Sequence, residues 1–79
     1  MSNSTAAADH PSGPRPLRFL RIREVLARTG LSKSTLYARV RVGEFPKPVP
    51  LGTLSAWVES EVEAWMEARV DERDRSSDR

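Results

Sequence analysis

The stretch Gly30–Phe45, "GLSKSTLYARVRVGEF", concentrates side chains that suit the binding of a polyanion. It holds three basic residues against one acid, with small and hydroxyl-bearing side chains between them. Guanidinium, ammonium and hydroxyl groups bind phosphate oxygens and also read base edges in a DNA groove. The chemistry that this stretch favours is therefore recognition of a nucleic acid.

The sequence lacks the residues that metal binding, catalysis or membrane insertion would need. The chain has 79 residues, no cysteine and a single histidine, His10, in a polar tail. We therefore expect no metal and no other cofactor. No Ser/His/Asp or Cys/His set and no glycine-rich phosphate loop is present, so we predict that the protein is not an enzyme. Apolar runs are far shorter than the roughly 20 residues that span a bilayer, and no secretory signal is visible. These features predict a cytoplasmic, nucleoid-associated protein without membrane contact.

The net charge of +2 hides an asymmetry along the chain. Residues 17–50 carry eight basic side chains and two acids, net +6, whereas residues 51–79 carry four basic side chains and eight acids, net −4. Residues 1–16 have one charge of each sign, so the three parts sum to 0 + 6 − 4 = +2. A basic half beside an acidic half indicates one side that faces a polyanion. Chance clustering on a solvated surface is the alternative reading of this count.

Two short helices are needed to position the basic stretch. Apolar or small side chains recur along "IREVLARTG" at the spacing of one helical face: Ile22, Val25, Leu26 and Thr29. Gly30 is suited to end this helix, because glycine adopts the left-handed conformation readily. Ser32 can then cap a second helix, which runs to about Val42 and stops at Gly43. A helix, a short turn and a second helix form the outline of a helix-turn-helix.

The second helix has an inner and an outer face. A helical wheel directs Leu36 and Val40 inward, with Tyr37 and Arg39 on the flanks. The outer arc is Ser34, Thr35, Ala38, Arg41 and Val42. Small side chains let a backbone approach a groove floor, and the longer arginines reach bases or phosphates. An ordinary amphipathic helix with a solvated face would show the same pattern, so both readings stay open at this point.

A proline pattern predicts a hairpin after the second helix. Prolines alternate at positions 46, 48 and 50, which removes the N–H donors from one side of the segment. Such a segment can pair with one neighbour only, as an outer strand. Gly52-Thr53 would form the tip and Leu54–Val58 the returning strand. Because a two-stranded hairpin is unstable alone, we expect Phe45 and Trp57 to tie it to the helices as a wing.

The remaining chain supplies a third helix and two tails. Ser60 and Glu63 fit a capping box at the helix start. An apolar stripe should pack on the core: Val62, Trp65, Met66 and Val70. The acidic outer face would be repelled by phosphate. We thus predict a mainly α fold with a small β-hairpin in one domain over residues 17–70, a disordered tail over 1–16 and a frayed charged tail over 71–79.

These segments together resemble a known family. "LRIREVLARTGLSKSTLYARVRVGEFPKPVPLG", followed by "WVESEVEAWMEARV", resembles the AlpA family of small phage-associated transcriptional regulators. The resemblance implies a winged helix-turn-helix of the MerR and excisionase-like kind. It implies that the helix matching Ser32–Arg41, about residues 33–42, enters the major groove. The segment matching Lys47–Trp57 would be the wing over the DNA backbone.

The resemblance also implies that the protein is a prophage-type regulator with a set of DNA-binding residues. They are Arg23, Lys33, Ser34, Thr35, Tyr37, Ala38, Arg39, Arg41, Lys47, Thr53 and Ser55. Tyr37 would lay its ring on the core with its hydroxyl directed to a phosphate, or would fill the core alone. Related sequences often carry a basic residue in the hairpin that "LGTLSAW" matches. Here that segment is uncharged, so the wing is expected to contribute shape and the hydroxyls of Thr53 and Ser55.

Three functions are compatible with these residues. The first is a sequence-specific transcriptional regulator on double-stranded DNA. It would act as a homodimer or cooperative oligomer, because one module buries only about 600–1,000 Å². The alternative is an excisionase-like recombination directionality factor that bends attachment-site DNA and works with a recombinase. The third is a protein-interaction adaptor that uses Glu63 and Glu67 of the acidic last helix.

Overall fold

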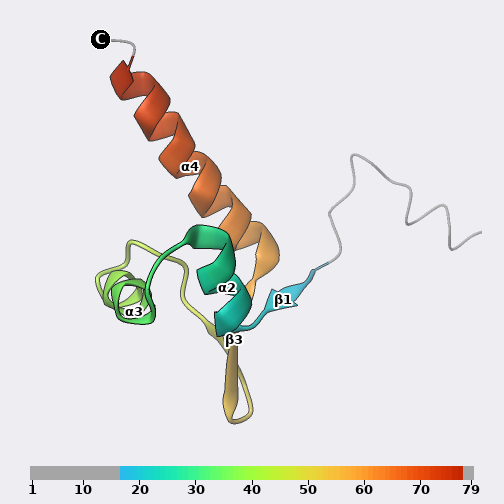
Figure 1. Cartoon of the computed structure of the whole chain (residues 1–79). Coiled ribbons are helices and arrows are strands. Elements are labelled where there is room, and N and C mark those ends of the chain that lie inside the picture. Colours follow the sequence, from blue (N-terminus) through green and yellow to red (C-terminus); the bar gives the residue numbers. More distant parts are fainter. Residues whose placement is uncertain (1–16, 78–79) are drawn as a thin grey trace, which may run out of the picture.

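Three helices and a small antiparallel sheet make up the described part of the chain, residues 17–77 of the computed structural model (Figure 1). The order of elements is β1 (Phe19–Leu20), α2 (Ile22–Thr29), α3 (Lys33–Arg41), β2 (Val49–Leu51), β3 (Leu54–Val58) and α4 (Glu59–Ser77). The expected mainly α fold with a β-hairpin is confirmed. The tail predicted over residues 1–16 lies outside the described residues.

The two predicted helices α2 and α3 form where local signals place them. Gly30 adopts a left-handed φ of 77°, and its N–H donates to the Leu26 carbonyl at 2.8 Å. The Ser32 hydroxyl accepts the Thr35 N–H at 3.2 Å and so satisfies an otherwise unpaired donor of the first turn. Gly43, at φ 80°, follows the end of α3. The helix-turn-helix spacing is therefore confirmed.

The sheet confirms the predicted hairpin and adds a strand. Its order is β1-β3-β2, so β2, which contains Pro50, is an edge strand paired to one neighbour. Leu51 faces Leu54 across the Gly52-Thr53 turn, as expected. The added strand, β1, pairs Phe19 with Val58 and Leu20 with Trp57 on β3, and no pattern in the sequence had indicated a strand there. A strand of two residues carries no periodic pattern, and only its pairing partner makes it a strand.

One core receives side chains from every helix, from the strands β1 and β3, and from the link between α3 and β2. The buried apolar residues are Leu20, Val25, Leu36, Phe45, Ala56, Trp57 and Val62. Trp57 is fully buried, and its indole N–H donates to the Pro46 carbonyl at 2.9 Å. Phe45 is also buried, so the expectation that these two aromatic residues tie the hairpin to the helices is confirmed.

The last helix departs from the prediction at its start. The predicted Ser60 cap is wrong, because α4 begins at Glu59 directly after β3 and Ser60 lies inside its first turn. The Glu59 N–H instead donates to the Arg18 carbonyl at 2.7 Å. The pairing between β1 and β3 thus extends to the first residue of the helix and gives a partner to one of its otherwise unpaired N–H groups.

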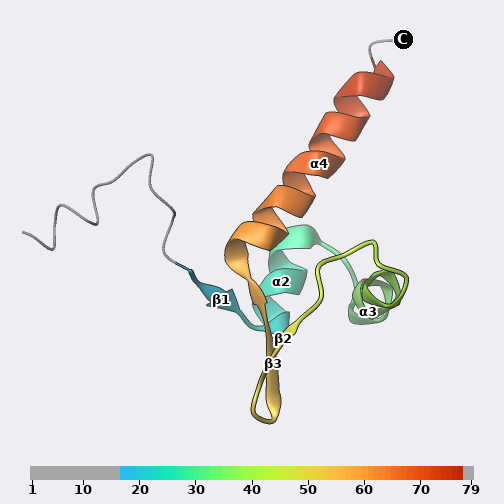
Figure 2. The same ribbon diagram turned by 180° about the vertical axis from the view of Figure 1, so that it is seen from behind.

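The apolar stripe of α4 ends earlier than predicted. Val62 is buried, and Trp65 and Met66 pack on the core, but Val70 is 46% exposed. The helix continues to Ser77 and projects well past the sheet (Figures 1 and 2). The exposure of Val70 shows that the core ends before this residue. None of the helices in the described range is long and apolar enough to cross a membrane.

Candidate nucleic-acid interface

Helix α3 is held by one face and leaves the opposite face in solvent. Leu36 is fully buried and Val40 packs against the core. All five residues of the predicted outer arc are exposed: Ser34, Thr35, Ala38, Arg41 and Val42. The predicted orientation of the helix is confirmed. That this arc contacts DNA stays a prediction.

Tyr37 connects α3 to the hairpin. Its half-buried ring is tilted by 56° against Trp57, with the ring centroids 6.1 Å apart. Trp57 belongs to β3 and is fully buried, so this aromatic pair sets the position of α3 relative to the hairpin. The ring of Tyr37 therefore lies on the core, as the sequence indicated.

Several basic side chains between Arg21 and Lys47 have no acidic partner in the described part of the chain. Across residues 17–77, no ion pair is formed by the exposed side chains of Arg21, Arg23, Lys33, Arg41 and Lys47. Four of them are predicted DNA contacts. Arg21, at the start of α2, was not predicted as one, although it contributed to the positive charge of this half. No spacing pattern singled it out, and only its exposure and lack of a partner do so.

Two other basic residues are neutralised within the fold. Arg28 pairs with Glu59 at 3.0 Å, with Glu24 at 3.3 Å and with Glu63 at 3.7 Å. Arg18 reaches Glu59 at 3.4 Å and Glu24 at 3.8 Å. We call these five residues the charge seam; it joins α2 and the segment before β1 to the first two turns of α4. Desolvation opposes the charge of Arg28, but the carboxylates of Glu59 and Glu24 outweigh it and raise the pKa of Arg28.

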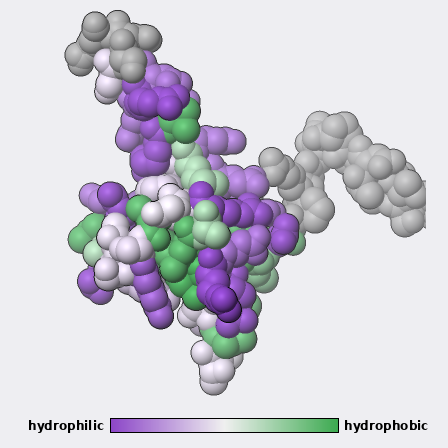
Figure 3. Space-filling model, viewed as in Figure 1, coloured by the Kyte–Doolittle hydropathy of each residue, from purple (hydrophilic) through white to green (hydrophobic). Residues whose placement is uncertain are grey.

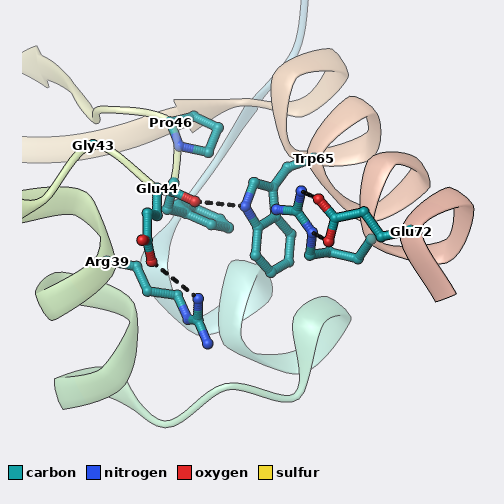
Figure 4. Close-up of a pocket in the computed structure, with 8 residues that line it drawn as sticks. Arg39, Gly43, Glu44, Pro46, Trp65 and Glu72 are labelled. Atoms are coloured by element: carbon teal, nitrogen blue, oxygen red, sulfur yellow. Dashed lines mark hydrogen bonds and ion pairs between the residues drawn. The ribbon is translucent and has the colours of Figure 1, made fainter. Parts of the chain in front are cut away.

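Arg39 differs from the other predicted contacts on α3. Its guanidinium Nη1 lies 3.4 Å from a Glu44 carboxylate oxygen, and its Nε is buried without a hydrogen-bond partner in the described structure. It lines an open pocket of about 750 Å³ between the end of α3, the following link and α4 (Figure 4). Arg39 is thus directed toward the link, on a flank of α3 and away from the centre of the outer arc.

The link after α3 packs against α4 in the same pocket. The Trp65 indole N–H donates to the Glu44 carbonyl at 2.7 Å, and the Phe45 ring meets Trp65 edge-on at 4.8 Å between centroids (Figure 4). The Arg69 guanidinium lies over Trp65 at 5.0 Å. These contacts fix the exit of α3 and hence the direction in which Lys47 and the hairpin leave.

The hairpin residues Thr53 and Ser55 are exposed. The hairpin projects from the body on the side away from the C-terminal end of α4, and α3 lies beside its base (Figures 1 and 2). In Figure 3 the surface of α4 is mostly hydrophilic, whereas the projecting hairpin shows hydrophobic and neutral surface. The structure thus brings the unpaired cations of α3 and the link near an uncharged wing.

A helix-turn-helix with an exposed second helix and an attached hairpin defines the winged class of DNA-binding regulators. The family model of the prophage CP4-57 regulatory protein (AlpA) matches residues 18–70, and the chain belongs to this family. It is 52% identical over 62 residues to "Uncharacterized protein ORF88" of Enterobacteria phage P4. That alignment covers 77% of this chain and 70% of the phage protein. No solved structure matches the chain.

Proposed function

We propose that the protein is a sequence-specific transcriptional regulator whose α3 enters the major groove of double-stranded DNA, with the β2–β3 hairpin as a wing. One observation carries the proposal. Leu36 and Val40 hold α3 on the core, while its opposite arc presents Arg41 and small or hydroxyl side chains to solvent. A major groove about 12 Å wide admits a helix, and short side chains at Ser34 and Ala38 permit close approach.

The cations around α3 have distinct tasks in this arrangement. Arg41 projects from the outer arc and reaches a base edge or a phosphate, while Lys33 at the helix start and Lys47 on the link bind phosphates on either side of the groove. Thr35 and Ser34 supply hydroxyls to bases, and Ala38 suits a thymine methyl group. Arg23 binds the backbone from the first turn of α2. Arg39 reaches DNA only if it leaves Glu44.

The salt dependence of binding follows from these assignments. Each neutralised phosphate contributes about −0.9 to the slope of log affinity against log salt. Arg23, Lys33, Arg41 and Lys47 together therefore give a slope of about −3.6, and Arg39 would bring it to about −4.5. A slope near zero would contradict the proposed interface.

Two copies on one site would supply the affinity that one module lacks. A single winged domain buries about 600–1,000 Å² of protein surface on DNA, which is small for tight specific binding. We propose binding as a homodimer on a symmetric site or cooperatively on repeated sites. Selection of bound sequences from random duplex DNA would report the site, its symmetry and the number of copies.

Arg41→Ala is the substitution that tests the interface most directly. We expect a loss of about 1–3 kcal/mol in binding to the selected site and a salt slope less steep by about 1. Fluorescence anisotropy titrations at several salt concentrations would measure both. Arg75→Ala is the matched control, since Arg75 is also an exposed arginine but lies in the last turn of α4. Equal losses in the two variants would contradict the proposal.

A second candidate function uses the same interface. An excisionase-like factor would bend attachment-site DNA and assist a recombinase, and the uncharged hairpin with exposed leucines at Leu51 and Leu54 favours it. An in vitro excision reaction with the recombinase, compared with promoter output in a strain lacking the protein, would separate the two functions. Excision that proceeds unchanged without the protein would dismiss the second one.

A further inference from the structure

The tip of the hairpin is uncharged and carries apolar side chains although it is exposed. No charged residue occurs from Pro48 to Val58, in a chain of which 30% is charged, and the exposed polar side chains of the hairpin are the hydroxyls of Thr53 and Ser55. Leu51 and Leu54 face each other next to the turn and are 40% and 45% exposed. Cross-strand partners extend to the same face of a sheet, so these two side chains form one apolar edge. An exposed apolar edge of this kind indicates a surface that becomes covered in a complex.

The base of the hairpin is rigid, so its tip keeps a defined place. Ala56 and Trp57 are fully buried, and Trp57 is hydrogen-bonded to the Pro46 carbonyl. Val49 pairs with Ala56 on the same face as the two leucines, which makes an apolar ridge that runs from the core to the tip. The tip itself projects beyond the helices (Figures 1 and 2). A firmly held projection with an apolar end has the form of a wedge.

We propose that Leu51 and Leu54 form a wedge that enters the minor groove beside the segment read by α3, partly unstacks a base step and bends the DNA. This rests on the proposed function, because α3 brings the duplex to the wing. Sugar rings line the minor groove and suit leucine side chains, and the contact needs no counterion release. Apolar side chains inserted between base steps kink the duplex toward the major groove.

The width of the minor groove supports the proposal that insertion of the hairpin bends the DNA. The minor groove of B-DNA is about 6 Å wide, and two paired strands lie about 4.8 Å apart before their side chains are counted. A hairpin therefore enters only a groove that has opened. Unstacking is easiest at pyrimidine–purine steps, so the preferred site should place a TA or CA step where the tip meets it.

The absence of charge also separates the wedge from the cations of α3. A contact made only by leucines changes affinity without changing the salt slope, because no phosphate is neutralised. Loss of a cation such as Arg41 changes both. This difference makes the two contributions measurable in the same titration.

The test compares the full chain with a Leu51→Thr/Leu54→Thr double variant on the selected duplex. Threonine keeps a high strand propensity, so the hairpin is retained while its apolar edge is lost. Leu17→Thr is the control, as Leu17 is a more exposed leucine outside the hairpin. Energy transfer between dyes at the two duplex ends reports the bend. Thermal unfolding checks the fold, and Leu51→Ile/Leu54→Ile should restore the wild-type behaviour if loss of apolar surface is the cause.

The expected result has three parts. The double threonine variant should bind about tenfold more weakly, with an unchanged salt slope and with most of the bend lost. Wild-type protein should bind a duplex with a mismatch at the contacted step more tightly than the matched duplex, because the mismatch lowers the cost of unstacking. The double variant should lose that preference.

Other results would overturn the wedge. An unchanged bend in the double threonine variant removes it, and so does a reduced salt slope. Loss of cooperativity on two-site DNA with normal single-site bending assigns the leucines to a contact with a second copy. If Arg41→Ala weakens binding while the leucine variants behave as wild type, the wedge fails and the proposed function stands. If the wild-type protein binds no duplex, both fail.

Discussion

Two groups of basic side chains come from the same positive half of the sequence, and the fold uses them differently. Arg18 and Arg28 lie in the charge seam, where Glu24, Glu59 and Glu63 neutralise them. Lys33 and Arg41 on α3 have no acidic partner in the described chain. The same residue type thus joins elements in one region and remains available to a polyanion in the other. A charge count indicates that an interface exists, but ion pairing decides which residues are available for it.

The largest effect should come from reversing the charges on α3. We expect Lys33→Glu/Arg41→Glu to lower the DNA affinity at least a hundredfold, equivalent to about 3 kcal/mol, because two attractive contacts become repulsive. Folding should persist, because both side chains are exposed and their effects on the helix dipole oppose each other: an acid is favourable at Lys33 in the first turn and unfavourable at Arg41 in the last. Anisotropy titration measures the loss. Arg75→Glu on α4 is the control, and a similar loss there would erase the distinction between the two regions.

A smaller effect, on stability only, is expected in the charge seam. Glu59→Gln removes a carboxylate that faces both Arg18 and Arg28 and should lower the free energy of unfolding by about 1 kcal/mol. DNA affinity measured well below the melting temperature should stay within twofold. Urea unfolding gives the stability, with Glu61→Gln as a control at an exposed site in the same helical turn. A large change in DNA affinity would place the seam in the interface.

The smallest effect concerns Arg39. Its single ion pair within residues 17–77, with Glu44, makes it intermediate between the neutralised cations of the charge seam and the unpaired cations of α3. Glu44→Gln releases its guanidinium and removes a negative charge near the groove, so affinity should rise about two- to threefold. Glu72→Gln, in the same pocket but on α4, should change affinity less. A fall in affinity for Glu44→Gln would instead mean that the Arg39–Glu44 pair positions the link and makes no contact with DNA.

Local signals account for much of the fold that the sequence predicted. Gly30 and Ser32 place the turn between α2 and α3 because one permits a left-handed conformation and the other caps a helix. The alternating prolines predict an edge strand because they remove donors from one side. Each of these effects acts within a few residues and needs no knowledge of the rest of the chain.

The wrong predictions all involve segments that meet at a distance. Ser60 has the right neighbours for a cap, yet β3 runs directly into α4 and Arg18 supplies the backbone partner. Val70 continues the apolar stripe, yet it lies past the end of the core. Phe19 and Leu20 show no strand pattern, yet they pair with β3. For Ser60 and for Phe19–Leu20 a partner far along the chain decided the outcome, and for Val70 the extent of the core did.

The features of the candidate site also fall into two kinds, those that local spacing predicted and those that depend on distant residues. The amphipathic spacing of α3 indicated which arc would face outward, and the exposed Arg41 and Ser34 follow it. The i,i+4 spacing of Glu24 and Arg28 suits an ion pair within one helix. No spacing could indicate that Arg28 would also meet Glu59 and Glu63, that Arg39 would pair with Glu44, or that Arg21 would stay unpaired.

The helices, the hairpin and the orientation of α3 could be predicted from the sequence, because periodicity, capping and missing N–H groups act over a few residues. Which cations are neutralised, where α4 begins and how far the core extends became evident only in the folded chain. Ion pairs and strand pairing depend on distances between residues that are far apart in the chain, and only the folded chain sets those distances.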